Sequence, residues 1–157
     1  MKFELTTETK IVFGIKLFRI RALKAIARIN IKVGDLGGWV EKENNLNQDG
    51  DAWVSGDAWV YGNARVSGNA SVSGDARVYG DARVSGNADV LWFKNTWSSG
   101  RWFTYTRSNK KWAVGCFYGT GEELIRKAYA DSERSGKCYE ATVRYVEALE
   151  AAKGGEK

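Results

Sequence analysis

Residues 50–91 read GDAWVS-GDAWVY-GNARVS-GNASVS-GDARVY-GDARVS-GNADVL, which is seven consecutive units of six residues. Glycine, Asp or Asn, alanine and valine hold fixed positions in every unit, so this is a genuine repeat rather than a bias of composition. Alanine and valine stand two residues apart and point to one side of a strand, while the residue between them points to the other. The Gly-Asx pair suits a corner, because these residues tolerate a left-handed backbone. The stretch therefore predicts a β-solenoid filled by alanine and valine.

The outward residues support a coil of three units, or 18 residues. Outward positions 18 apart are occupied by the pairs Tyr61 and Tyr79, Arg65 and Arg83, and Trp59 and Arg77. Strands on successive coils lie about 4.8 Å apart, so each pair is expected to stack. The sequence predicts a mainly β fold built on a short left-handed β-helix, a hexapeptide solenoid of about three coils.

The same geometry predicts which side chains are buried and which are displayed. The buried set is expected to include Val60, Val66, Val72, Val78 and Val84. The displayed faces are expected to carry Trp59, Tyr61, Arg77 and Tyr79 on the first, Arg65 and Arg83 on the second, and Trp53, Ser71 and Asp89 on the third. The Tyr61–Tyr79 pair has a second interpretation as ordinary stacking between strands, worth about 1 kcal/mol, whose loss a capped solenoid would survive.

The flanks are expected to cap the ends of the solenoid, because open strand edges invite aggregation. The chain then divides into an N-terminal β cap (1–33), the repeat solenoid (34–91) and a C-terminal strand-and-helix module (92–157). Strands are expected over 3–23, with a turn near Gly14, and over 29–33. Degenerate coiling is expected to begin near Gly34. Its inward residues would be Val40 and Leu46 at alanine positions and Leu36 at a valine position.

In the C-terminal module, strands are expected over 90–95, 101–107 and 111–118. Thr120 and Glu123 form a capping box that opens a helix running to about Ser132. Gly136 is expected to separate it from a second helix over about 138–152. Four tryptophans cluster here, namely Trp92, Trp97, Trp102 and Trp112. Most of them are expected to fill a small α+β core, and the rest are candidates for a stacking surface.

Composition excludes several function classes. Histidine is absent, which removes the commonest general base and the commonest metal ligand. Cys116 and Cys138 are too few for a typical zinc site. The aspartates of the repeat alternate with asparagine at the same corner position, which indicates turn formers rather than acids or calcium ligands. We expect no catalytic residue, no metal and no cofactor. With neither an apolar membrane segment nor a signal sequence, a cytoplasmic protein is expected.

Charge is unevenly spread over a net +5. The stretches 10–32 and 90–121 are basic and contain no acidic residue, whereas the repeats carry more acid than base. Such basic blocks can attract phosphate, although solvated strand faces are the favoured explanation. The candidate nucleic-acid-binding residues are Arg19, Arg21, Lys24, Arg28, Arg101, Arg107, Lys110 and Lys111.

Several motifs outside the repeats point to one family. The run GDLGGWVEKENNL (34–46), the G-[DN]-A-x-V-[SY] units, LWF (91–93) and GCFYGT (115–120) resemble an uncharacterised family of phage and prophage hexapeptide-repeat proteins. The resemblance covers nearly the whole chain but departs at 22–35, which is more apolar here, and in the missing histidine between the helices. It implies a phage origin and, by association, a role as an inhibitor or modulator of host machinery. It supplies no catalytic residue.

Two binding hypotheses follow. In the first, the rigid solenoid docks on a host protein, such as a component of a defence system in the manner of an anti-CRISPR protein, or a host enzyme. The partner-binding residues would be Trp59, Tyr61, Arg65, Arg77, Tyr79 and Arg83, which are residue types common in binding hot spots. In the second, the basic and aromatic flanks bind nucleic acid without sequence preference. A homo-oligomer formed through solenoid faces is a third possibility. Acyl transfer, the usual activity of hexapeptide helices, is disfavoured because it needs a histidine.

Overall fold

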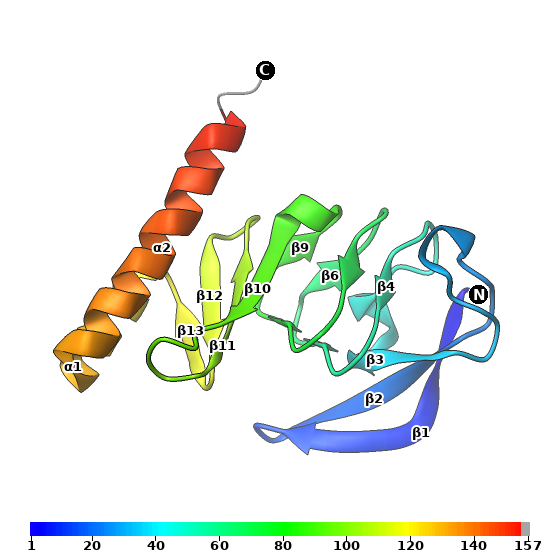
Figure 1. Cartoon of the computed structure of the whole chain (residues 1–157). Coiled ribbons are helices and arrows are strands. Elements are labelled where there is room, and N and C mark those ends of the chain that lie inside the picture. Colours follow the sequence, from blue (N-terminus) through cyan, green and yellow to red (C-terminus); the bar gives the residue numbers. More distant parts are fainter. Residues whose placement is uncertain (155–157) are drawn as a thin grey trace.

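The computed structural model describes residues 1–154 and is an elongated, mainly β structure (Figure 1). An N-terminal hairpin lies at one end, the short strands of the repeats occupy the middle, and a small sheet with helices lies at the other end.

The N-terminal hairpin joins the solenoid through one continuous sheet. Strands β1 (Phe3–Val12) and β2 (Ile15–Ala22) pair antiparallel across the turn at Phe13 and Gly14, both left-handed. Strand β3 (Leu36–Val40) pairs antiparallel with β2 and parallel with the repeat strand β5 (Trp59–Val60). Strand β8 (Arg77–Val78) completes the sheet, in the order β1-β2-β3-β5-β8.

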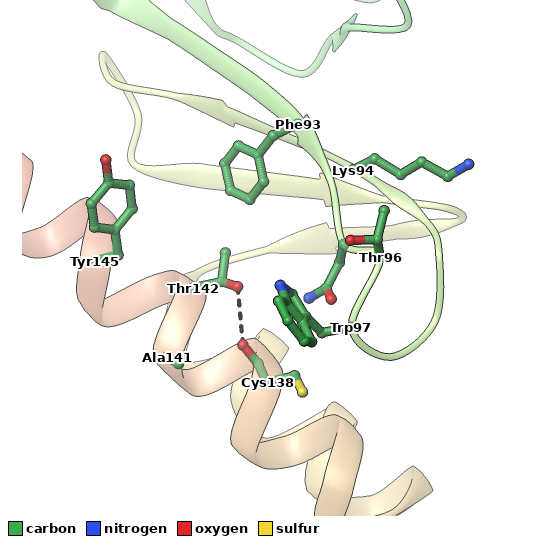
Figure 2. A pocket seen from close by; sticks show the side chains of 9 residues that line it. Phe93, Lys94, Thr96, Trp97, Cys138, Ala141, Thr142 and Tyr145 are labelled. Atoms are coloured by element: carbon green, nitrogen blue, oxygen red, sulfur yellow. Dashed lines mark hydrogen bonds between the residues drawn. The ribbon is translucent and has the colours of Figure 1, made fainter.

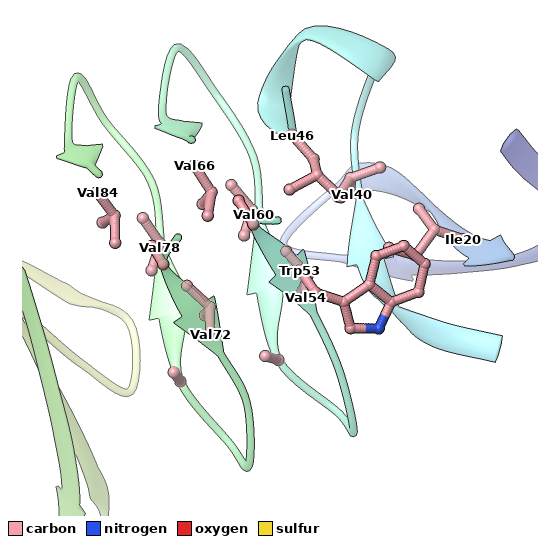
Figure 3. Close-up of a cluster of buried hydrophobic side chains, with 14 of the residues drawn as sticks. Ile20, Val40, Leu46, Trp53, Val54, Val60, Val66, Val72, Val78 and Val84 are labelled. Atoms are coloured by element: carbon pink, nitrogen blue, oxygen red, sulfur yellow. The ribbon is translucent and has the colours of Figure 1, made fainter. Parts of the chain in front are cut away.

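The repeats form two-residue strands that pair 18 residues apart. The remaining repeat strands are β4 (Trp53–Val54), β6 (Arg65–Val66), β7 (Ser71–Val72) and β9 (Arg83–Val84). Parallel pairing joins β4 to β7, β5 to β8 and β6 to β9. All five valines predicted to be buried are fully buried, and they line the interior with the repeat alanines (Figure 3).

The register before the repeats differs from the prediction. Val40 pairs with Val60, and Leu46 bridges to Val66, so both extend the valine column rather than the alanine column. The separation there is 20 residues, because two extra residues are accommodated before the regular period begins. Leu36, expected inside, is 48% exposed.

The strand predicted over 29–33 is absent, and a short 3₁₀ helix (Ala27–Ile29) precedes a loop there. This segment covers the third face of the solenoid. Arg28 donates to the Asn69 carbonyl and pairs with Asp51, while Ile26 belongs to the same apolar cluster as Trp53. Trp53 is consequently buried, which corrects the prediction that it is displayed.

The seventh unit departs from the solenoid. It contains a 3₁₀ helix (Asn87–Asp89), and Ala88 is exposed rather than inward. The Asp89 carboxylate, predicted to be displayed, accepts hydrogen bonds from the Ser85 and Gly86 amides and so closes a turn in place of a further strand. Asp89 therefore ends the repeat.

The direction of the backbone N–H and C=O groups determines which hydrogen-bonding groups the caps must provide at each end of the solenoid. In the coils the N–H groups of alternate residues point toward the C-terminal end, as in the bonds from the Trp59 and Tyr61 amides to the carbonyls of Ala76 and Val78. The last coil therefore presents unpaired N–H groups. Three of them donate to side-chain oxygens just beyond the coil, in the pairs Ser71 to Asn87, Arg77 to Thr104, and Arg83 to Ser108.

The first coil presents carbonyls instead, and its caps are donors. The Lys2 ammonium donates to the carbonyls of Gly50 and Ala52, at 3.3 and 2.6 Å. The Asn45 amide donates to the carbonyls of Gly62 and Ala64. Each end thus receives the hydrogen-bonding groups that its backbone lacks.

The C-terminal module is an antiparallel sheet covered by helices. Its strands are β10 (Val90–Lys94), β11 (Trp102–Thr106), β12 (Lys111–Val114) and β13 (Phe117–Gly119). The third predicted strand is split in two by a turn in which Gly115 is left-handed. The capping box at Thr120 is confirmed and opens α1 (Gly121–Asp131).

Helix α2 (Glu133–Gly154) begins earlier than predicted and contains Gly136. The absence of a side chain at Gly136 has a packing reason, since a Cβ there would overlap the Tyr129 ring of α1. The glycine therefore marks a close helix–helix contact rather than a helix boundary. Tyr139, Val143 and Val146 of α2 are buried against the sheet, whereas Leu149, which the helical spacing places on the same stripe, is 40% exposed.

Candidate binding site

The aromatic face predicted to dock a partner is largely covered. Tyr61 is only 6% exposed, and Trp59, Arg77 and Tyr79 are half-buried. Tyr61 and Tyr79 do stack as expected, with ring centres 4.6 Å apart. Because both phenols are partly removed from water, burial raises the pKa of Tyr61 to about 12 and also raises the pKa of Tyr79.

Remote segments provide this cover. The hairpin brings Leu17 and Ile15 into one apolar cluster with Tyr61 and Tyr79. From the other end, Tyr118 of β13 continues the stack, 4.4 Å from the Tyr79 ring. The Tyr79 hydroxyl donates to the Phe117 carbonyl at 3.2 Å. The tyrosine ladder, defined as Tyr61, Tyr79 and Tyr118, thus joins the hairpin, the solenoid and the C-terminal module.

Trp59 and Arg77 belong to a second internal row. Along the sheet, Trp39 lies beside Trp59, which lies beside Arg77. The Arg77 guanidinium stands 4.3 Å from the Trp59 ring centre, and the Lys10 ammonium stands 4.4 Å from that of Trp39. Burial lowers the pKa of Lys10. These cation–π contacts stabilise the join between hairpin and solenoid, which leaves little of this face for a partner.

The predicted nucleic-acid-binding residues do not form one surface. They lie on the hairpin side and on the C-terminal module, on either side of the solenoid (Figure 1). Four are paired with acids from other parts of the chain: Arg19 with Glu8, Arg21 with Glu4, Arg28 with Asp51, and Arg107 with Asp89 and Glu150. Lys24, Arg101 and Lys110 are exposed, and Lys111 is half-buried.

Arg65 and Arg83 are placed as predicted. They pair directly across β6 and β9, and both side chains are exposed. They line a polar hollow of about 260 Å³ together with Lys42, Asn44 and Asn63. Within residues 1–154 neither arginine forms a salt bridge.

A larger and more apolar hollow, about 490 Å³, lies in the C-terminal module between the end of β10 and helix α2 (Figure 2). This aromatic pocket is defined by its lining residues Phe93, Lys94, Asn95, Thr96, Trp97, Cys138, Ala141, Thr142 and Tyr145. Trp97 is 79% exposed and Tyr145 is 62% exposed. Large aromatic side chains left this open on one concave surface are typical of an interaction site.

The floor of the aromatic pocket is rigid and apolar. Phe93 packs against Phe103 and Trp112, with ring centres 5.7 and 6.4 Å apart. The Thr142 hydroxyl donates to the Cys138 carbonyl within α2, which satisfies its hydrogen-bonding capacity inside the helix (Figure 2).

The loop that carries Trp97 is anchored although the side chain is exposed. Arg134 of α2 donates to the Trp97 carbonyl at 3.0 Å, and the Tyr139 hydroxyl donates to Ser99 at 2.7 Å. Asn95 is buried and bonds to both Arg101 and Gly100 through its backbone. Trp97 is therefore held in place by hydrogen bonds that do not involve its ring.

Sequence reasoning does not find this pocket. The sequence predicts that most of the four tryptophans fill the core and does not say which one is displayed; Trp112 is buried, Trp92 and Trp102 are half-buried, and Trp97 is exposed. A usable signal exists in α2. Cys138, Ala141 and Tyr145 recur at helical spacing on a different stripe from the buried Tyr139, Val143 and Val146.

The six-residue repeats, the parallel pairing 18 residues apart and the valine-lined interior define a β-solenoid repeat protein. In agreement, residues 58–74 and 76–90 match a family model described as YdcK Beta solenoid repeat. A search of curated proteins gave no significant match. Across residues 1–154, neither helix is long and apolar enough to cross a membrane, and no group of three His, Cys, Asp or Glu side chains is placed to hold a metal ion.

Proposed function

We propose that this chain is a non-enzymatic binding protein that docks on a partner protein through the aromatic pocket of its C-terminal module. The observation that carries the proposal is Trp97, whose side chain is exposed while its loop is fixed to α2. Because the backbone that carries Trp97 is already fixed, little backbone entropy is lost when a partner binds, so the contact area of the exposed ring contributes efficiently to affinity.

The lining residues suggest the chemistry of the partner. The floor is apolar, and Trp97 and Tyr145 flank it, so the entering group is an aromatic or branched aliphatic side chain. Lys94 is the charged residue of the lining and is exposed. A carboxylate next to the entering side chain would complement it. The partner segment is therefore apolar with an adjacent Asp or Glu.

The solenoid serves in this proposal as a rigid support rather than as the docking face. Its caps and the tyrosine ladder connect it on both sides, so the pocket is presented on a preorganised body. We further propose that the coil is left-handed with about three turns, as hexapeptide repeats suggest. In line with the phage-family resemblance, we propose a host protein as the partner, inhibition as the outcome and the host cytoplasm as the location.

A peptide-display selection on the immobilised protein tests the docking site, because random peptides sample many candidate partner segments at once. The selection should enrich sequences that carry an aromatic or branched aliphatic residue beside Asp or Glu. The Trp97→Ala/Tyr145→Ala variant should bind these peptides at least about tenfold more weakly, because the two walls of the pocket are removed.

Ile11→Ala is the matched control, since Ile11 is also an exposed apolar side chain but lies on the hairpin. Both variants should melt at the parent temperature, and the control should bind like the parent. No enrichment, or enriched peptides that bind the double variant as well as the parent, would refute the proposed site.

A further inference from the structure

Arg65 and Arg83 belong to a row of cations that runs along the solenoid axis. Arg83 lies directly beside Arg65 in the adjacent strand, and Lys42 precedes the 3₁₀ helix (Glu43–Asn45) that underlies β6 through the Leu46–Val66 bridge. Successive layers of a solenoid are about 4.8 Å apart. The row therefore presents one positive charge per layer.

The C-terminal module closes this face beyond Arg83. Its turn after β11 caps β9, since the Arg83 amide donates to Ser108 at 2.8 Å. The cation row is thus defined as Lys42, Arg65 and Arg83, which line one hollow.

The corners of the coils beside the face formed by β6 and β9 carry few acidic residues. The corner residues that border β6 and β9 are Asn63, Asn69, Asp81 and Asn87, whereas the other corners carry Asp51, Asp57 and Asp75. The exception, Asp81, already accepts a hydrogen bond from Asn109 at 2.9 Å. Glu41, next to Lys42, accepts from the Gly62 amide at 2.8 Å. The choice of Asn at three of these four corners therefore reduces the acidic charge beside this face, and Glu43, the other acid next to Lys42, accepts a hydrogen bond from Gln48.

The hollow between the cations is suited to an anion. Its lining consists of Lys42, Arg65, Arg83, the amides Asn44 and Asn63, and Ala64. Guanidinium groups bind phosphate in a bidentate manner, and the side-chain amides add further donors. The hollow contains no aromatic or large aliphatic side chain to anchor a peptide.

We propose that the cation row binds the phosphate backbone of a nucleic acid, without reading its sequence. A row of cations on successive layers matches a linear polyanion better than a single small anion, and the net charge of +5 favours the same partner. This site is separate from the aromatic pocket and does not depend on the function proposed for it.

Fluorescence anisotropy with labelled oligonucleotides of about 20 nucleotides, single-stranded and duplex, tests the site as salt rises from about 50 to 200 mM. Binding should weaken steeply with salt. Arg65→Ala/Arg83→Ala should reduce the slope of log K against log salt by about two units and the affinity at low salt at least about tenfold. Both arginines are exposed, so this variant should melt like the parent.

Two further variants make the result specific. Arg126→Ala/Lys127→Ala removes the same charge from an exposed face of α1 and should bind like the parent. Arg65→Lys/Arg83→Lys keeps the charge and should keep the salt slope.

Absent binding at low salt, or equal losses in the Arg65/Arg83 and Arg126/Lys127 alanine variants, would overturn the proposal. Equal affinity for polyglutamate of the same charge would also overturn it, in favour of an acidic protein. Displacement of the oligonucleotide by inorganic phosphate at equal phosphate concentration would instead indicate a single-anion site.

Discussion

A side chain in the core of the solenoid can hardly change in size, because the interior of each coil holds only one layer of inward-pointing side chains. Val72 is fully buried, pairs with Val54 on the neighbouring coil and faces the repeat alanines. Such a position tolerates the loss of volume poorly and the addition of charge not at all.

The first prediction concerns this valine. Val72→Ala should lower the free energy of unfolding by about 1–3 kcal/mol, through lost burial and the cavity left behind. Val72→Asp should cost more, because an unpaired carboxylate loses its hydration. Urea denaturation followed by circular dichroism measures both. Arg65→Asp, at an exposed position of β6, is the control and should be close to neutral. A Val72→Asp variant as stable as the parent would contradict the buried placement.

The second prediction concerns pH. An unfolded tyrosine ionises near pH 10, whereas burial raises the pKa of Tyr61 to about 12. The stabilisation from the neutral phenol is complete below pH 10 and is lost as the pH rises toward 12. Burial lowers the pKa values of Lys2 and Lys10, so these two groups make stability rise with pH. Their effect is confined to pH values below 10.5, the ordinary pKa of lysine.

Between pH 10.5 and about 12, stability should therefore fall by up to about 1.4 kcal/mol per pH unit for each such tyrosine. Tyr61→Phe keeps the ring but removes the ionisable group, so its stability should fall less steeply. Urea denaturation at a series of alkaline pH values gives the slopes. Equal slopes for parent and Tyr61→Phe would show that this phenol is not buried.

At the scale of elements, the ends of the solenoid are closed by side chains that replace missing strands. Thr104 of β11 accepts from the Arg77 amide at the open edge of β8. The third prediction is that Thr104→Val, which keeps the shape but removes the acceptor, costs about 1–3 kcal/mol by leaving a buried N–H unpaired. Hydrogen exchange should accelerate at Arg77 more than at Trp59, whose amide bonds to the backbone. Unchanged exchange at Arg77 would argue against side-chain capping.

Elements with a local signal could be predicted from the sequence. The repeat period specifies the inward valines, and the Thr120–Glu123 capping box specifies the start of α1. Predictions from the sequence are wrong where the role of a residue depends on a contact with another segment of the chain. Gly136 resembles a helix boundary in the sequence, although it makes room for the Tyr129 ring. The predicted phase before the repeats is wrong because two extra residues lie between Val40 and Val60.

At the scale of the whole molecule, the flanks do more than cap the ends. They cover two faces of the solenoid, which is why the aromatic ladder, visible in the sequence as a period of 18, is buried. No local pattern shows that the hairpin and β13 converge on Tyr61 and Tyr79. The aromatic pocket escapes prediction for the same reason, since Phe93 and Trp97 meet α2 more than 40 residues further along the chain. Arg65 and Arg83 could be predicted, because nothing folds over them.

The most direct test is a comparison of melting and binding for two double variants on the same samples. Tyr61→Ala/Tyr79→Ala should lower the melting temperature on the order of 10 °C, because it removes a buried ring and the half-buried ring stacked on it, at a cost of several kcal/mol. Trp97→Ala/Tyr145→Ala should melt like the parent and lose affinity for the selected peptides. A ladder variant that melts like the parent yet loses peptide binding, with a pocket variant that keeps it, would contradict this assignment and return the binding role to the solenoid face.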